Sequence, residues 1–197
     1  MGNWWHVDQN SLKGDHRVGR VSVQGLVTYY KADASVGGLC IIPESHLQHS
    51  EICNRSSSAK YMRDFVTIDS DDPVLVGNTG LLISAEAGDL VLWDSRLVHC
   101  NTPALNMPTT TTTTNSSAQK SEDMDIIRLV SYVCMVPRST CTQEVLDSRK
   151  MAFIHRIPTS HWPNIPIEAE VSRRPPLQPN RNIADCSAEM LHLVGYE

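Results

Sequence analysis

The sequence predicts a mainly β domain: an antiparallel sandwich or barrel with a few peripheral helices. Short runs rich in Val, Ile, Leu and Tyr, bounded by Gly, Pro, Asn and Asp, fill the first two thirds of the 197 residues. No long amphipathic helix separates one run from the next, which argues against alternating βαβ units. A chain of this length can bury a core without disulfides.

The apolar runs place the predicted elements in order along the chain. Strands are expected at residues 21–31, 38–42, 74–76, 81–84, 89–93 and 126–136. Helices are expected at 44–51, at 142–155 with Thr140 as its N-cap, and in a short final segment around 188–193.

Two stretches depart from this pattern. Residues 106–124 contain six consecutive threonines followed by polar residues, which predicts a disordered insertion loop. After Pro163 the chain becomes rich in Pro and Arg. We therefore expect one domain over residues 1–163 and a C-terminal tail, 164–197, packed on it.

Composition and motifs exclude several functions. Seventeen Lys plus Arg against 22 Asp plus Glu give a net charge of −5, the wrong sign for bulk nucleic-acid binding. The apolar runs are too short to span a membrane, and no secretory signal is recognisable, so an intracellular, cytoplasmic protein is expected. Six cysteines without a C-x-x-C pair favour buried free thiols. Hydrolase, P-loop and dinucleotide motifs do not occur.

Two segments carry candidate metal ligands. His6 and Asp8 stand at i and i+2, the spacing that points both side chains to one face of a strand. Taken alone, this spacing is a weak indication of a metal site, because two exposed polar residues near a terminus would give the same pattern. Residues 88–101 indicate a turn, a buried strand, a second tight turn and His99 at the start of another strand, as a jelly roll presents a distal ligand.

Two His and one carboxylate on one face of a β barrel form a facial triad that leaves positions open for a bidentate co-substrate and dioxygen. The far carboxylate of such a co-substrate needs a cation, for which Arg is suited. Arg128 is the candidate: it follows His99 by 29 positions, or by 10 once the 19-residue loop 106–124 is set aside.

The order of motifs resembles one family, the phytanoyl-CoA dioxygenase-like branch of the iron(II)- and 2-oxoglutarate-dependent oxygenases. The resemblance covers roughly residues 4–138. Its segments are Trp5-His6-Val7-Asp8, then Val23-Gln24-Gly25-Leu26-Val27, then Gly37-Gly38-Leu39 with Pro43 and Ser45-His46, then Gly88-Asp89 through His99, and Arg128 on a strand.

The resemblance implies a double-stranded β-helix (jelly roll) and a dioxygenase that hydroxylates a C–H bond while converting 2-oxoglutarate to succinate and carbon dioxide. On it, His6, Asp8 and His99 would bind Fe(II), and no further catalytic residue is expected. Arg128 would hold 2-oxoglutarate, helped by Asn101, which lies two residues beyond His99 and on its face. Ascorbate is the expected reductant, and a small molecule or acyl group the substrate; its identity and the oligomeric state stay open.

Two alternatives stay open beside this interpretation. One is a catalytically inactive jelly-roll binding protein or shortened isoform, because only five residues precede His6, where the family has a longer segment. In that case His6 and Asp8 would be poorly held unless Trp4 and Trp5 pin their strand. The other is a cupin-like metalloprotein that does not use 2-oxoglutarate, since residues 88–101 also resemble a cupin motif.

Other residues near these motifs are not expected to act in the site. Arg96 is expected to pair with Asp94 and fix the turn before His99. His46 and His49 are expected at the surface. Position 130, where some 2-oxoglutarate enzymes carry Ser two residues after the Arg, is Val, and Ser131 should face away.

Overall fold

The computed structural model describes residues 4–14, 18–19, 21–62, 64–105, 126–157, 159–165 and 182–196. The predicted insertion loop 106–124 lies outside these residues. The chain divides into two compact units, one formed by residues 1–21 and 25–132 and the other by residues 22–24 and 133–197. The predicted division into a domain over 1–163 and a tail stays a prediction.

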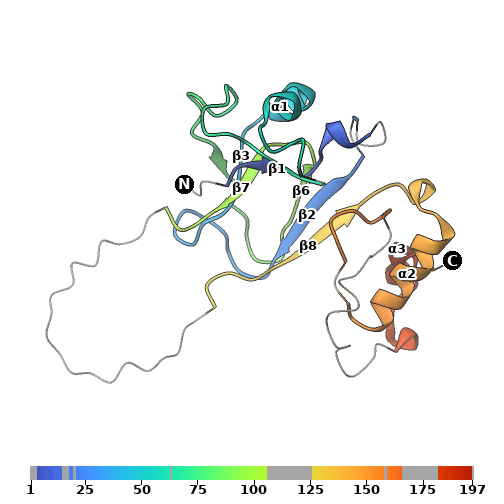
Figure 1. The fold of residues 1–197 in the computed structure, drawn as a ribbon. Coiled ribbons are helices and arrows are strands. Elements are labelled where there is room, and N and C mark those ends of the chain that lie inside the picture. Colours follow the sequence, from blue (N-terminus) through green and yellow to red (C-terminus); the bar gives the residue numbers. More distant parts are fainter. Residues whose placement is uncertain are drawn as a thin grey trace, which may run out of the picture. The chain divides into compact units, whose positions relative to one another are not determined.

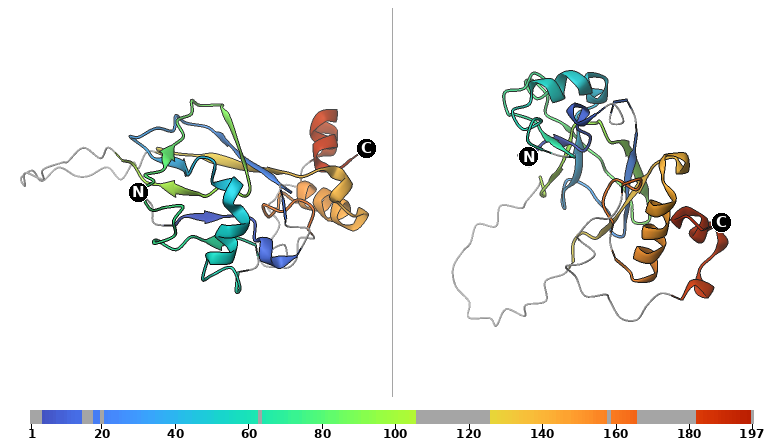
Figure 2. Two further views of the ribbon diagram at one scale, coloured as in Figure 1. Left: turned by 90° about the horizontal axis from the view of Figure 1, so that it is seen from above. Right: turned by 45° about the vertical axis from the view of Figure 1, so that its right-hand side comes forward.

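The fold is mainly β, as the sequence predicts, and resembles a jelly roll. Within the described residues, eight strands form two antiparallel sheets with the orders β4-β1-β7-β3-β5 and β6-β2-β8 (Figures 1 and 2). The strands are β1 (His6–Val7), β2 (Val23–Thr28), β3 (Gly38–Ile41), β4 (Val66–Thr67), β5 (Leu81–Leu82), β6 (Leu90–Asp94), β7 (His99–Thr102) and β8 (Val130–Met135).

Side-chain alternation gives the five-stranded sheet two different faces. On one face, Val7 and Val98 pack with Ile52 of helix α1 (His49–Arg55) in a core that is almost free of solvent. On the other face, Leu39 of β3 meets Leu26 of β2 and Trp93 of β6. Since this second core draws on both sheets, the sheets pack face to face.

Strand β1 is an interior strand of its sheet, lying between β4 and β7. His6 pairs with Thr67 on one side and with His99 on the other. The carbonyl of Trp5 accepts a hydrogen bond from the Ile68 N–H (2.9 Å), and the Trp5 side chain packs against the core that contains Val7 and Ile52. Trp5 therefore helps to hold the ligand strand, whereas Trp4 is 55 % exposed.

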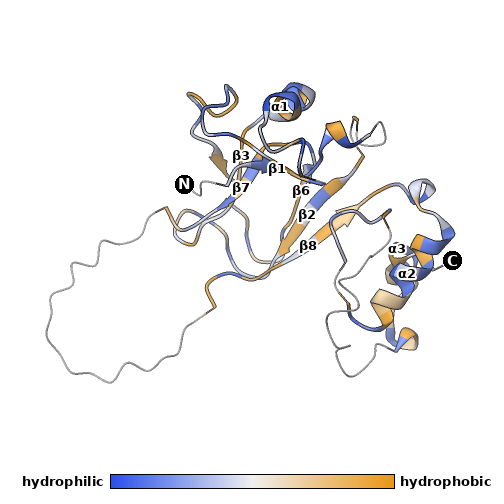
Figure 3. Cartoon of the chain, in the orientation of Figure 1, coloured by the Kyte–Doolittle hydropathy of each residue, from blue (hydrophilic) through white to orange (hydrophobic). Residues whose placement is uncertain are grey.

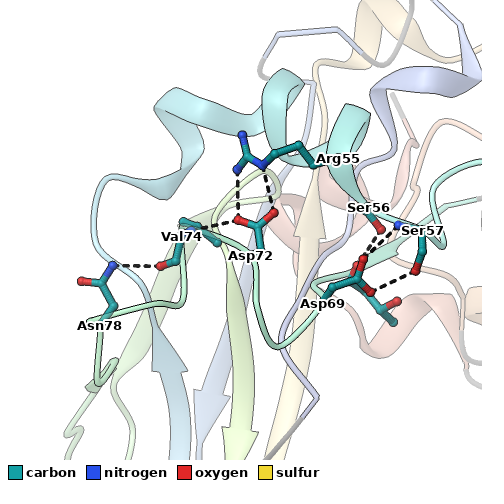
Figure 4. A network of polar contacts seen from close by, with 8 residues as sticks. Arg55, Ser56, Ser57, Asp69, Asp72, Val74 and Asn78 are labelled. Carbon is teal, nitrogen blue, oxygen red and sulfur yellow. Dashed lines mark hydrogen bonds and ion pairs between the residues drawn. The ribbon is translucent and has the colours of Figure 1, made fainter.

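The expected strand at 74–76 is wrong, because this segment is a turn organised by Asp72 (Figure 4). The buried Asp72 carboxylate accepts hydrogen bonds from Arg55 Nε and Nη2, both at 3.0 Å, and from the Val74 N–H at 2.8 Å. Asn78 closes the turn by donating to the Val74 carbonyl. Burial raises the pKa of Asp72, but the hydrogen bonds from Arg55 and Val74 outweigh it and hold this pKa below the ordinary value.

The three expected helical regions are helical. The first begins with the 3-10 helix η3 (Ser45–Gln48) and continues as α1. Helix α2 (Gln143–Ile154) is capped by Thr142, whose side chain accepts from the Val145 N–H, so the expected cap at Thr140 is wrong. Helix α3 is Ala188–Val194. Thr140 instead ends the 3-10 helix η4 (Arg138–Thr140); the described residues also form the 3-10 helices η1 (Ser11–Lys13) and η5 (Ile183–Asp185).

Short groups of hydrophilic and hydrophobic residues follow one another along α2 (Figure 3).

Among the described residues, no helix combines the length and apolar character that crossing a bilayer requires. None of the six cysteines, all of them among the described residues, forms a disulfide; Cys40, Cys53 and Cys100 are buried, and the other three are half-buried.

Candidate metal centre

The three predicted metal ligands converge on one point of the inter-sheet face. One ligand atom from each of His6, Asp8 and His99 lies within 4.8 Å of the others. His6 Nε2 is 3.6 Å from Asp8 Oδ1, and His99 Nε2 is 3.3 Å from Asp8 Oδ2. Both imidazoles are 5 % exposed, so the centre is nearly shielded from water. Such a group could hold a metal ion.

Strand register explains the convergence. His6 and His99 are direct partners in the antiparallel pair β1–β7, so their side chains lie side by side on one face. Asp8 follows His6 by two residues and reaches the same face. The imidazole centroids are 4.3 Å apart, and the Trp4 ring stacks on His6 at 4.1 Å.

Backbone carbonyls fix the orientation of both imidazoles. His6 Nδ1 lies 3.0 Å from the Trp4 carbonyl oxygen, and His99 Nδ1 lies 2.8 Å from that of Leu97. Because a carbonyl oxygen can only accept, each Nδ1 must carry the proton and donate it. Each Nε2 therefore presents a lone pair toward the Asp8 carboxylate, as metal-binding histidines do.

A cluster of buried polar groups holds the backbone at Asp8 and Gln9, directly after β1. The Asp8 N–H donates to the Ser95 carbonyl at 3.1 Å, and the Ser95 hydroxyl donates to Gln9 Oε1 at 2.6 Å. His49 Nε2 lies 2.6 Å from the Gln9 carbonyl oxygen and donates to it. These bonds connect Asp8 and Gln9 to the turn between β6 and β7 and to α1.

The prediction of a surface position is wrong for His49, which is 3 % exposed, and His46 is half-buried. Helix α1 packs against the sheet beside Gln9 and so carries His49 inward, which the i, i+3 spacing of the two histidines could not reveal. Burial lowers the pKa of His49 below its ordinary value, so the neutral form is favoured.

The predicted structural pairing of Asp94 and Arg96 is confirmed. Arg96 Nε and Nη2 donate to the two carboxylate oxygens of Asp94 at 2.9 and 2.8 Å, and the Arg96 N–H adds a third bond at 2.9 Å. Burial raises the pKa of Asp94, but the Arg96 hydrogen bonds outweigh it and lower the net value. The pair fixes the turn that leads into His99.

A second polar cluster joins Arg128, Asn101 and Tyr132. Arg128 Nη2 donates to Asn101 Oδ1 at 3.0 Å, and Asn101 Nδ2 donates to the Tyr132 hydroxyl at 3.3 Å. Arg128 Nε is buried and has no hydrogen-bond partner within the described part of the chain. Asn101 lies two residues after His99 on the same face of β7, about 7 Å further along the strand. Asn101 therefore places the cluster two residues along β7 from His99, on the same face of the strand.

Sequence reasoning missed Tyr132. Alternation in an extended segment puts positions 128, 130 and 132 on one face, and this signal could have identified the tyrosine. Ser131 lies on the opposite face, where its hydroxyl is 3.0 Å from that of Tyr29. The expectation that Ser131 faces away from Asn101 is consistent with this contact.

The donor set fits a first-row transition metal. Imidazole and carboxylate ligands in a 2:1 ratio are typical of non-haem iron(II) centres with open positions. Among the residues that the structure describes, no other His, Cys, Asp or Glu joins this group. Three ligands leave room for exogenous ones, whereas structural zinc sites use four protein ligands.

Comparisons with known proteins give limited matches. No protein-family model matches the chain. "Ava biosynthesis cluster protein O" of Aspergillus versicolor is 35 % identical over 77 residues, which is 39 % of this chain and 19 % of that protein. The solved structure titled "Crystal Structure of EvdMO1" shares 23 % identity at a TM-score of 0.33, over 50 % of this chain and 19 % of that one. The chain thus spans about a fifth of the length of either protein.

Proposed function

We propose that the chain is an iron(II)- and 2-oxoglutarate-dependent dioxygenase that hydroxylates a small molecule. The observation that carries the proposal is the convergence of His6, Asp8 and His99, with both Nε2 atoms facing one carboxylate at 3.3–3.6 Å. The resemblance of the motif order to the phytanoyl-CoA dioxygenase-like branch supports the same assignment.

The residues of this chain would bind and orient the reacting groups. His6, Asp8 and His99 would hold the metal, and the Nδ1 bonds to Trp4 and Leu97 keep both imidazoles in the ligating tautomer. When bound, iron(II) and 2-oxoglutarate supply the activation of dioxygen and the oxidative decarboxylation. The low exposure of the imidazoles excludes bulk water from the centre.

Arg128 fits the far carboxylate of 2-oxoglutarate. Its Nε is a buried donor without an acceptor among the residues that the structure describes, and such a donor favours an acceptor partner. A carboxylate would take this donor and neutralise the guanidinium. Asn101 orients Arg128 through Nη2, and the Tyr132 hydroxyl supplies a further polar group where Val130 offers none.

The name of the Aspergillus versicolor relative places that protein in a biosynthesis cluster. We extend this to the present chain as part of the proposal: an oxidative tailoring step in biosynthesis, acting on a small molecule. The shared stretch is short, and the support for the proposed reaction comes from the metal ligands.

The test is iron(II) binding together with the release of succinate from 2-oxoglutarate in the presence of ascorbate. The wild-type chain should bind one iron(II) per chain and release succinate only when iron is present. His99→Ala should lose both, because two protein ligands remain. His192→Ala, which removes an exposed histidine of α3, is the matched control and should retain both.

Iron binding and succinate release that survive in His99→Ala would contradict the proposal. Metal binding without consumption of 2-oxoglutarate would favour the cupin-like alternative. Neither binding nor turnover in a folded wild-type chain would favour the inactive binding protein.

A further inference from the structure

A cavity of about 490 Å³ lies where the two sheets end in strands β5 and β6. Its lining includes residues of β3 and β6 and Ile83, which directly follows β5. Its wall is mainly hydrophobic, with a polar rim that includes Glu44, His46 and Asp94. The hydrophobic wall comprises Leu39, Ile41, Ile83, Val91, Trp93 and Leu97. The volume is in the range of small-molecule sites.

The cavity adjoins the metal centre. Ile41 is the register partner of His99, so the two side chains lie side by side on the inter-sheet face. The Trp93 ring centroid is 5.5 Å from that of His99. The wall includes neither Arg128 nor Asn101, so a ligand here would reach the metal from a different side than the proposed co-substrate.

The wall carries one deeply buried polar atom without a partner. Trp93 is 9 % exposed, and its Nε1 has no hydrogen-bond acceptor among the residues with a described position. An indole N–H can only donate, and leaving a buried donor unpaired costs free energy. An oxygen atom of a ligand would satisfy it. His46 Nδ1, on the rim, is also buried without a partner.

The charges around the cavity disfavour an anionic ligand. Of the described residues that line it, none is Lys or Arg; Glu44 adds an exposed carboxylate, and Asp94 is already neutralised by Arg96. A phosphate-bearing substrate, such as an acyl group carried on a nucleotide, would find no cation here.

We propose that this cavity binds the apolar part of the substrate and that Trp93 Nε1 donates a hydrogen bond to one acceptor oxygen on it. The inference rests on the proposed function and specifies its substrate class: an uncharged, largely hydrophobic small molecule with a carbonyl or ether oxygen. The position of Trp93 beside His99 places that molecule next to the metal centre.

The first test uses fluorene and 9-fluorenone, tricyclic probes that differ in one carbonyl oxygen, with Kd measured by equilibrium dialysis. Trp93→Phe keeps an aromatic ring and removes the donor. The ratio of the fluorene Kd to the fluorenone Kd should fall about two- to tenfold in this variant, the range for one neutral hydrogen bond. A ratio within about twofold of the wild-type value would overturn the role of Trp93.

The second test fills the cavity. Val91→Phe should weaken both probes by more than about tenfold, because the added ring takes up their volume. Leu90→Phe is the matched control. Leu90 is next to Val91 in the chain, but its side chain is exposed and does not line the cavity, so both Kd values should stay unchanged. If Val91→Phe does not fold by circular dichroism, Ile83→Phe replaces it. Unchanged binding in the folded variant would overturn the cavity as the site.

Iron(II) binding and succinate release are measured on the same preparations, which separates the two proposals. Iron binding and turnover without probe binding would overturn the inference and leave the proposed function standing. Trp93-dependent probe binding in a chain that neither binds iron nor consumes 2-oxoglutarate would support the ligand class and overturn the proposed function.

Discussion

Replacing Arg128 with Ala should weaken 2-oxoglutarate binding and leave the metal centre intact. The structure bounds the effect. Arg128 is half-buried, so the cost of about 3–5 kcal/mol for breaking a fully buried charge pair is an upper limit. A hydrogen bond to a charged group is worth about 1.5–3 kcal/mol. The KM for 2-oxoglutarate should therefore rise by about tenfold to a hundredfold.

The assay is succinate release as a function of 2-oxoglutarate concentration, combined with iron(II) stoichiometry for each variant. Arg128→Lys keeps the charge but loses the planar fork and the buried Nε donor, so its KM should lie between the wild-type and Ala values. Lys31→Ala removes an exposed cation that pairs with Glu86 and should change neither quantity.

An unchanged KM in Arg128→Ala would refute the reasoning, because another cation would then hold the carboxylate. A parallel loss of iron(II) stoichiometry would also contradict it. That result would mean that Arg128 supports the fold around His99 rather than the co-substrate.

Three further predictions follow from the contacts around the centre. Tyr132→Phe should raise the KM for 2-oxoglutarate by about two- to tenfold, the range for one neutral hydrogen bond, with kcat and iron stoichiometry unchanged; an altered stoichiometry would contradict this. Ser95→Ala leaves Gln9 Oε1 without this donor, so calorimetry should show a Tm lower by about 2–10 °C, whereas the exposed control Ser50→Ala should show no shift. Since burial lowers the pKa of His49, its neutral form stabilises the fold above about pH 6.5, and that contribution is lost as the pH falls from there toward the folded pKa. The free energy of unfolding, measured with urea between pH 7 and 5.5, should therefore change less with pH in His49→Gln than in the wild type. An equal pH dependence in the two proteins would argue against this role of His49.

The parts of the fold that could be predicted are those that short-range patterns encode. Alternation places His6 and Asp8 on one face, and the turn signals around residues 88–97 place His99 at the start of a strand. The runs that became β2, β3 and β6 are long enough to show β propensity. In each case the information lies within a few residues of the site that it describes.

The parts that could not be predicted depend on distant partners. Strand β4 has only two residues, and it is defined by pairing with β1. The apolar run 74–76 looks like a strand, but Asp72 and Arg55 hold it in a turn. The burial of His49 depends on where α1 packs. Tyr132 joins the site through Asn101, which comes from another sheet.

The same distinction between local and distant control applies within the metal centre. Each imidazole is oriented by the carbonyl two residues before it, Trp4 for His6 and Leu97 for His99, so its tautomer is set within its own segment. The distance between the two imidazoles follows from one pair of strands. Asp8 is different, because its backbone is fixed by Ser95, 87 positions away along the chain. Disturbing the turn between β6 and β7 should therefore displace the Asp8 carboxylate and also His99, whose orienting Leu97 carbonyl lies in the same turn, while His6 keeps its orientation through Trp4.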